Sequence, residues 1–92
     1  MLGGKVYQVY VLQNPGGKFY VGLSENVRVR LHQHNQGISN WTRKHRPWSL
    51  VWTSESLSLS EARRLENRLK RQKGGIGFRS LTGLSGEVSS IA

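Results

Sequence analysis

Residues 6–23 read VYQVYVLQNPGGKFYVGL, in which two runs rich in β-branched and aromatic residues flank a short turn sequence. Such residues pack well on a pleated sheet, so we expect strands over residues 5–12 and 18–23. Between them, Asn14-Pro15-Gly16-Gly17 provides the restricted φ of proline and the positive φ that glycine allows. The two strands should therefore form an antiparallel hairpin, with Tyr10 and Tyr20 on neighbouring strands.

The residues after the hairpin have the spacing of a helix. Ser24 can accept a hydrogen bond as the N-cap of a helix that runs to about Asn35. Val27 and Leu31 stand four residues apart, which places both on the buried face of this helix. Gly37 is expected to end the helix.

A loop and a third strand come next. Residues 37–47 are polar, basic and bounded by glycine and proline, which is typical of a long loop, and this loop carries Trp41. Residues 48–53, WSLVWT, alternate as a strand does. Strand alternation predicts Trp48, Leu50 and Trp52 on one face and Val51 on the other.

The second half of the chain begins with a capping box, Ser58-Leu59-Ser60-Glu61, which predicts a helix from there to about Lys73, before Gly74-Gly75. Residues 76–81 are expected to form a short closing turn that covers the core with Phe78 and Leu81. We predict a small α/β (α+β) domain over residues 1–81, a three-stranded antiparallel sheet flanked by helices. Residues 82–92 are expected to be a flexible tail.

Composition excludes several classes of protein. The 92 residues contain 14 Lys and Arg against five acids, a net charge of +9, and they contain no cysteine. Disulfide scaffolds, thiolate metal clusters and cysteine nucleophiles are thereby excluded. All five acids are glutamates, so a Ser-His-Asp triad is excluded as well. With no secretory or membrane-spanning segment in view, we expect a cytoplasmic protein without membrane contact.

Basic residues gather in two zones. Residues 28–46 contain five Lys or Arg and three His without an acid, and residues 63–79 contain seven more, interrupted only by Glu66. This pattern favours a nucleic-acid partner, with an ordinary solvated basic face as the alternative. Trp41 either stacks on nucleic acid or anchors its loop to the core. The candidate nucleic-acid contacts are Arg28, Trp41, Arg43, Lys44, Arg46, Arg63 and Lys70.

Glu66 is the most unusual acid in the chain. It falls beside the apolar stripe that Ala62, Leu65 and Leu69 trace at helical spacing. Burial of a lone carboxylate is costly unless it is paired or binds a metal. Two interpretations stay open from the residues alone: a salt bridge to an arginine such as Arg30 or Arg63, or a metal site.

Other candidate residues lie in the hairpin and the first helix. Arg30 and His34 stand at i and i+4, so they can converge on one spot. An arginine can bind a phosphate with two donors and a histidine can relay a proton, although both side chains could simply face solvent. Tyr10 and Tyr20 are either sheet packing or site residues. Gly22 would leave room for a ligand to approach them.

These residues form an ordered set that resembles one family. The set is Gln8-Val9-Tyr10, Tyr20-Val21-Gly22, Arg30, His34 and an Ala62-xxx-Glu66 helix, and it is similar to the GIY-YIG endonuclease domain. The likeness spans residues 6–81 and extends to short stand-alone bacterial members through Arg46-Pro47-Trp48 and Lys73-Gly74-Gly75. Gln8-Val9-Tyr10 departs from the Gly-Ile-Tyr of the family, although it keeps the tyrosine.

The resemblance implies a divalent-metal-dependent endonuclease that hydrolyses DNA by a one-metal mechanism. Glu66 would bind Mg²⁺ (or Mn²⁺), Arg30 would contact the phosphate, and His34 matches a histidine found in part of the family. Tyr10, with Tyr20 alongside, would position or deprotonate the attacking water, and basic neighbours are expected to lower the tyrosine pKa. The alternatives are a non-catalytic nucleic-acid-binding module on the same scaffold and an RNA-directed nuclease.

Overall fold

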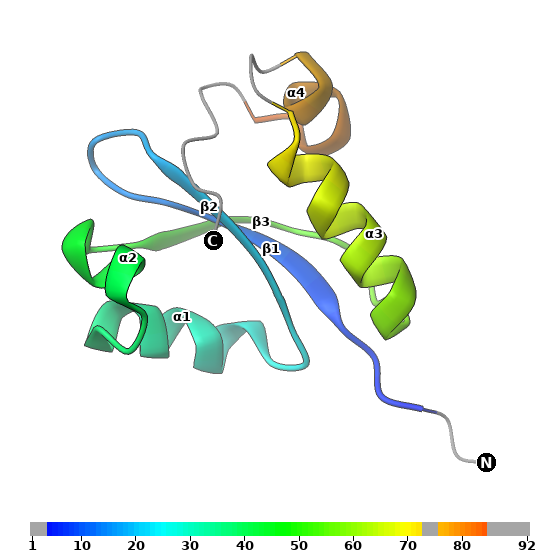
Figure 1. Cartoon of the computed structure of the whole chain (residues 1–92), viewed down its shortest axis with the longest axis horizontal. Helices are drawn as coiled ribbons and strands as arrows, with labels where there is room; N and C mark the ends of the chain where they lie inside the picture. The colour runs from blue at the N-terminus through cyan, green and yellow to red at the C-terminus, as the bar shows by residue number, and fades with distance from the viewer. Residues whose placement is uncertain (1–3, 73–75, 85–92) are drawn as a thin grey trace.

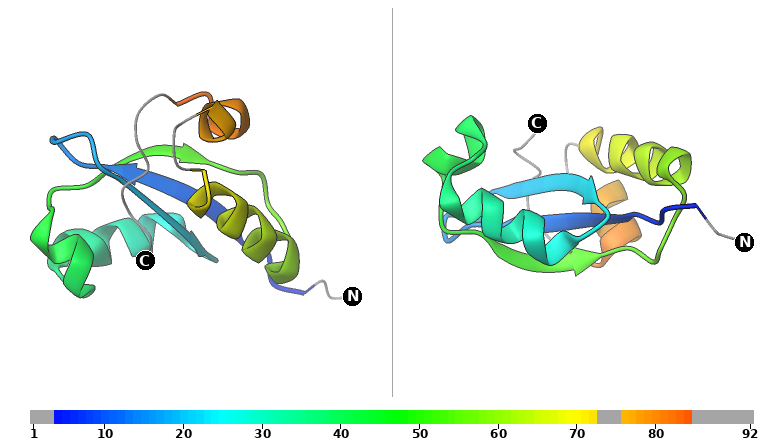
Figure 2. Two further views of the ribbon diagram at one scale, coloured as in Figure 1. Left: turned by 45° about the horizontal axis from the view of Figure 1, so that its top comes forward. Right: turned by 90° about the horizontal axis from the view of Figure 1, so that it is seen from below.

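The computed structural model describes residues 4–72 and 76–84 as three strands and four helices. The strands form one antiparallel sheet in the order β2-β1-β3. Helices α1 and α2 lie to one side of the sheet and α3 and α4 to the other (Figures 1 and 2). The predicted fold class is thereby confirmed. In chain order the elements are β1 (Gln8–Gln13), β2 (Phe19–Ser24), α1 (Val27–Gln36), α2 (Asn40–Lys44), β3 (Ser49–Thr53), α3 (Leu59–Lys70) and α4 (Ile76–Thr82).

The hairpin of β1 and β2 follows the prediction. The Asn14 side chain accepts a hydrogen bond from the Lys18 backbone at 2.8 Å, and Gly17 has a φ of +87°. This turn sets a register in which Tyr20 pairs with Leu12, so Tyr10 and Tyr20 lie on neighbouring strands. Their ring centroids are 6.2 Å apart.

Strand β1 is central, and its alternating side chains separate two hydrophobic cores. The first core lies on the side of α3 and α4, and the second on the side of α1 and α2. Both faces of the sheet are therefore covered by helices. The first core contains Val9, Val11, Phe19, Val21, Ala62, Leu69 and Phe78, and the second contains Tyr10, Leu12, Tyr20, Val27 and Trp48.

The prediction that Trp48, Leu50 and Trp52 share one face of the third strand is wrong. Val11 pairs with Trp52, but the next residue, Leu12, pairs with Leu50, so the register shifts within β3. An extra residue on one strand reverses the faces of the residues beyond it. Trp48 consequently lies in the second core, whereas Trp52 packs against the first.

The first helix begins later than the sequence predicts. Ser24 is still part of β2, and Asn26 is the N-cap, with its side chain accepting from the Val29 backbone at 3.2 Å. The Ser24 hydroxyl instead accepts from the Asn26 backbone at 2.9 Å, which stabilises the turn into the helix. Gly37 ends α1 with a φ of +87°, as expected.

A short helix, α2, lies inside the stretch predicted to be a loop. The Arg46 guanidinium donates to the carbonyls of Arg43 and Asn35, and the Trp48 indole donates to the Thr42 carbonyl at 2.8 Å. A helix of five residues carries too little periodicity to be recognised in a sequence, and hydrogen bonds from Arg46 and Trp48, just beyond its C-terminus, stabilise it here.

The capping box of α3 is present as predicted, with Glu61 and Ser58 bonded reciprocally. The helix ends at Lys70, and the predicted stop at Lys73-Gly74-Gly75 lies outside the described residues. Residues 76–82 form a helix, α4, where a turn was expected, and Phe78 packs on Phe19 with ring centroids 5.1 Å apart. Of the predicted tail, Leu84 packs against the first core, and residues 85–92 lie outside the described residues.

Gly22 faces Tyr10 across β1 and β2, and the Tyr10 ring uses the space that a side chain at position 22 would fill. A Cβ on Gly22 would lie 2.5 Å from the Tyr10 hydroxyl oxygen and 2.6 Å from the ring carbon that bears it. The sequence suggested that Gly22 leaves room for a ligand. In the structure that room holds Tyr10 instead.

Replacement of Gly22 by alanine should therefore displace the Tyr10 ring and destabilise the fold by about 1–3 kcal/mol, the usual cost of overpacking. Gly16→Ala is the matched control, because its Cβ would meet only the Asn14 side chain at an ordinary 3.6 Å. That variant should stay within about 0.5 kcal/mol of the parent in urea unfolding. Equal stability of the two variants would contradict this account of Gly22.

Candidate active site

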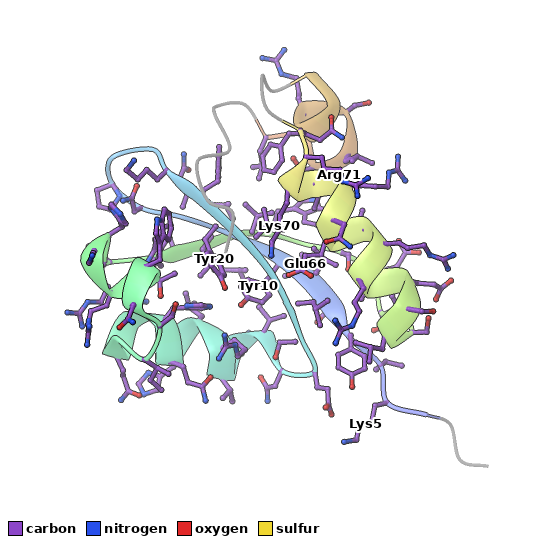
Figure 3. All side chains as sticks on the ribbon, viewed as in Figure 1. Lys5, Tyr10, Tyr20, Glu66, Lys70 and Arg71 are labelled. Carbon is purple, nitrogen blue, oxygen red and sulfur yellow. The ribbon has the colours of Figure 1, made fainter. Side chains whose placement is uncertain are left out.

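Four elements bring the five predicted catalytic residues together. Tyr10 comes from β1, Tyr20 from β2, Arg30 and His34 from α1, and Glu66 from α3. In Figure 3 the Glu66 and Lys70 side chains extend from α3 toward the part of the sheet that carries the two tyrosines. The charges of Arg30 and Glu66 both affect the pKa of each tyrosine, as expected for groups in one small site.

A buried line of hydrogen bonds begins at Tyr10. Its hydroxyl lies 2.9 Å from His34 Nε2, and His34 Nδ1 lies 2.9 Å from the hydroxyl of Thr42 in α2. Tyr10 and His34 are each 1% exposed, and Thr42 is fully buried. The alternative that His34 faces solvent is therefore wrong, although His32, two residues earlier, is exposed.

The tyrosines do not have the lowered pKa that the basic sequence suggests. Burial raises the pKa of Tyr10, the neighbouring Tyr20 raises it further, and Arg30 offsets this only in part. Burial raises the pKa of Tyr20 as well, against the opposing Arg30 charge. Loss of water around a phenolate outweighs the attraction of one guanidinium, so both phenols are neutral near pH 7.

His34 is neutral for the complementary reason. Burial, assisted by the positive charge of Arg30, lowers its pKa from 6.5 to about 4. At neutral pH the ring therefore has one N–H and one nitrogen lone pair. Arg30 is half-buried and donates to the Gln33 side chain at 2.8 Å, which holds the guanidinium on the same face of α1.

Glu66 pairs with Lys70, a cation that the sequence predicts to contact nucleic acid. The Lys70 ammonium, one turn further along α3, lies 3.1 Å from a Glu66 carboxylate oxygen. The Lys70 side chain is 20% exposed and the Glu66 side chain 19%, so this salt bridge is partly buried. The partner is thus neither Arg30 nor Arg63, and Lys70 is engaged with Glu66 instead of reaching into solvent.

The donor set fits a magnesium-type ion in one particular way. Among residues 4–72 and 76–84, no three His, Cys, Asp or Glu side chains gather into a complete metal cage. Mg²⁺ is nevertheless often bound by one carboxylate together with waters and substrate phosphate. Glu66 supplies such a carboxylate, and its charge acts on the pKa of both phenols. It already attracts a cation, the ammonium of Lys70.

The predicted nucleic-acid contacts differ in their surroundings. Arg28, Lys44 and Arg63 are exposed, and Arg28 lines an open pocket of about 350 Å³ beside the start of α1. Arg43 donates to the Asn40 side chain at 2.9 Å. The guanidinium of Arg46 is exposed, but it is already bonded to backbone carbonyls.

Trp41 packs on the second core. Its ring stacks on Tyr20 with centroids 6.2 Å apart, and it lies 5.7 Å from Trp48 and 4.6 Å from His45. The side chain is half-buried. This packing matches the anchoring interpretation of Trp41, and the part that remains exposed lies in the basic segment around α2.

Residues 6–77 match the family model of the GIY-YIG catalytic domain. The chain belongs to the GIY-YIG family. Proteins named UPF0213 from Nitratidesulfovibrio vulgaris, Halobacterium salinarum and Streptococcus pneumoniae are each 36% identical to it. The matches cover 74%, 72% and 71% of this chain and 63%, 87% and 67% of those proteins, respectively. No solved structure matches the chain.

Membership in the GIY-YIG family confirms the resemblance drawn from the ordered motif residues and places this domain in a family of nucleases.

Two features of the site were not predicted from the sequence: the contact of Thr42 with His34 and the pairing of Lys70 with Glu66. Thr42 stands in an apparent loop, where no spacing rule connects it to His34.

In the part of the chain that the structure describes, no helix combines the length and apolar character needed to cross a membrane.

The buried His34 should make the stability of this GIY-YIG domain depend on pH. The unfolded chain binds a proton near pH 6.5, whereas folded His34 stays neutral to about pH 4. Its stabilising contribution is complete above pH 6.5 and is lost as pH falls through this window, by up to about 3 kcal/mol. Urea unfolding at several pH values should show this loss in the parent and in His32→Gln, which changes an exposed ring. Equal pH slopes for His34→Gln and the parent would contradict the assignment.

Proposed function

We propose that this protein is a divalent-metal-dependent endonuclease that hydrolyses phosphodiester bonds of DNA. The observation that carries the proposal is the meeting of one carboxylate, one guanidinium and two neutral phenols in a chain of a nuclease family. A net charge of +9 supports a polyanionic substrate. The exposed cations and the accessible part of Trp41 are the proposed DNA contacts.

Arg30 is the proposed phosphate ligand. Its guanidinium can donate two parallel hydrogen bonds to phosphoryl oxygens, and the half-buried position strengthens them relative to bulk water. The Gln33 side chain already orients the group from the same helix. Arg30 would therefore stabilise the negative charge that develops on phosphorus-bound oxygens in the transition state.

Tyr10 is the proposed contact of the attacking water, with Tyr20 beside it. Because the Tyr10 phenol is neutral, it cannot act as a standing phenolate base. It can accept the proton of the water while its own proton passes to His34 Nε2, which lies 2.9 Å away. The lone pair of a neutral imidazole completes this transfer.

Glu66 would hold Mg²⁺ or Mn²⁺. When bound, the ion would neutralise charge on the scissile phosphate and on the leaving oxygen. The Glu66 carboxylate must first release Lys70, whose ammonium then stands on α3 beside the phosphate site. Lys70 thereby remains a proposed nucleic-acid contact, although it is paired with Glu66 in the free protein.

Replacement of Glu66 by glutamine should lower the cleavage rate by about 10²–10³, equivalent to about 2.7–4 kcal/mol of barrier, and leave DNA binding in place. Labelled duplex, nicked, branched and single-stranded DNA, with matching RNAs, would be incubated with Mg²⁺, Mn²⁺ or chelator. Glu55→Gln, at an exposed site outside the helix, should cleave as the parent does.

Each alternative gives its own result in that experiment. A parent protein that binds every substrate but cleaves none would be a non-catalytic binding module. Cleavage confined to RNA would support the RNA-directed nuclease. A Glu66→Gln protein that cleaves at the parent rate in Mg²⁺ would move the metal site away from this carboxylate.

DNA binding should depend steeply on salt. If about five phosphates are neutralised, the slope of log K against log salt concentration should be about −4 to −5 on duplex DNA. Arg63→Gln removes one exposed cation of α3 and should reduce the magnitude of that slope by about 1. Fluorescence anisotropy from low to moderate salt would measure both values, and a slope near zero would contradict an electrostatic interface.

A further inference from the structure

Thr42 has a buried hydroxyl and belongs to none of the motifs found in the sequence. Its oxygen lies 2.9 Å from His34 Nδ1 and 3.4 Å from the Ser39 carbonyl oxygen. The backbone of the same residue is anchored as well, because its carbonyl accepts from the buried Trp48 indole at 2.8 Å. Helix α2 therefore presents this hydroxyl to the imidazole in a defined position.

The chemistry of these partners sets the direction of each hydrogen bond. The Ser39 carbonyl can only accept, and the Thr42 hydroxyl donates its single proton to it at 3.4 Å, alongside the Arg43 backbone N–H at 2.9 Å. The Thr42 oxygen then accepts from His34, which places the imidazole proton on Nδ1. With that proton on Nδ1, Nε2 has the lone pair and accepts from the Tyr10 hydroxyl.

The opposite arrangement would change what Tyr10 offers to a substrate. If Thr42 donated to Nδ1, Nε2 would carry the proton and donate it to Tyr10, and the Ser39 carbonyl would keep only the Arg43 backbone N–H as a donor. The Tyr10 proton would then point toward the site. A phenol that presents its proton cannot accept one from an attacking water at the same position.

We propose that Thr42 is a positioning residue that holds His34 as the Nδ1–H tautomer, so that Tyr10 presents an oxygen lone pair to the attacking water. The tautomer is a property of the free protein. Its consequence for rate rests on the proposed nuclease function. Thr42 acts through His34 and does not touch the substrate.

In the proposed site, the proton moves from the attacking water through Tyr10 to His34. While the water oxygen forms its bond to phosphorus, a water proton passes to the Tyr10 oxygen and the Tyr10 proton passes to His34 Nε2. The bond to the leaving oxygen breaks, and that oxygen keeps the electron pair until solvent protonates it. His34 becomes an imidazolium that still donates from Nδ1 to Thr42.

The charged group facing His34 is Arg30, and the other titratable neighbours of His34 are Tyr10 and Tyr20. Repulsion by Arg30 favours return of the proton through Tyr10.

The decisive test is the tautomer of His34, read from ¹⁵N chemical shifts and long-range ¹H–¹⁵N couplings of the free protein near pH 7. The parent and Thr42→Ser, which keeps the hydroxyl, should both show a protonated Nδ1 and an unprotonated Nε2. Thr42→Val, which keeps the shape without the hydroxyl, should shift His34 toward Nε2–H. A parent with Nε2–H would overturn the proposal even if the valine variant fails to fold.

Cleavage assays with the same proteins test the catalytic consequence. Thr42→Val should lower kcat at least about tenfold with unchanged DNA affinity, and Thr42→Ser should retain most of the rate. A shifted tautomer with an unchanged kcat would overturn the role of Thr42 while the nuclease function stands. If the parent cleaves nothing, the proposed function fails, and the NMR result alone decides whether Thr42 sets the tautomer.

Discussion

The pairing of Tyr10 with Gly22 across β1 and β2 is the constraint on which the site depends. Because β1 is the central strand and both faces of the sheet are covered, each of its side chains is confined to one of the two cores. The missing side chain at position 22 lets the Tyr10 ring lie across β2, with its hydroxyl 2.9 Å from His34. A one-residue slip of the hairpin would turn this phenol to the opposite face.

Burial makes the centre of the site electrically neutral, and charged groups stand around it. It raises the pKa of both tyrosines and lowers that of His34, so phenols and imidazole all carry no charge near pH 7. Arg30 and the Glu66–Lys70 pair lie at the edge, where partial exposure reduces the cost of their charges. Protons can therefore move among neutral groups, while the charged groups bind a phosphate and a cation.

Helix α2 links the packing of the protein to its proposed chemistry. It is held by Arg46, by the Trp48 indole and by the packing of Trp41 on Tyr20. These same contacts deliver the Thr42 hydroxyl to His34. A five-residue helix has little stability of its own, so its position is a product of the second core.

The sequence by itself determined the hairpin and the capping box of α3, because turn chemistry and capping act within a few residues. The candidate set Tyr10, Tyr20, Arg30, His34 and Glu66 came from the ordered resemblance to the GIY-YIG domain. Only the tertiary structure decided the register shift that separates Trp48 from Trp52, the helix α2 and the room that Gly22 gives to Tyr10. The raised pKa of the tyrosines belongs to the same group, since a sequence shows the charges around a phenol but not how much water it loses. The register shift joins residues that are distant along the chain, such as Leu12 and Leu50, and so does the hydrogen bond between Tyr10 and His34, 24 positions apart. No local preference specifies such contacts, because each forms only when both cores are packed.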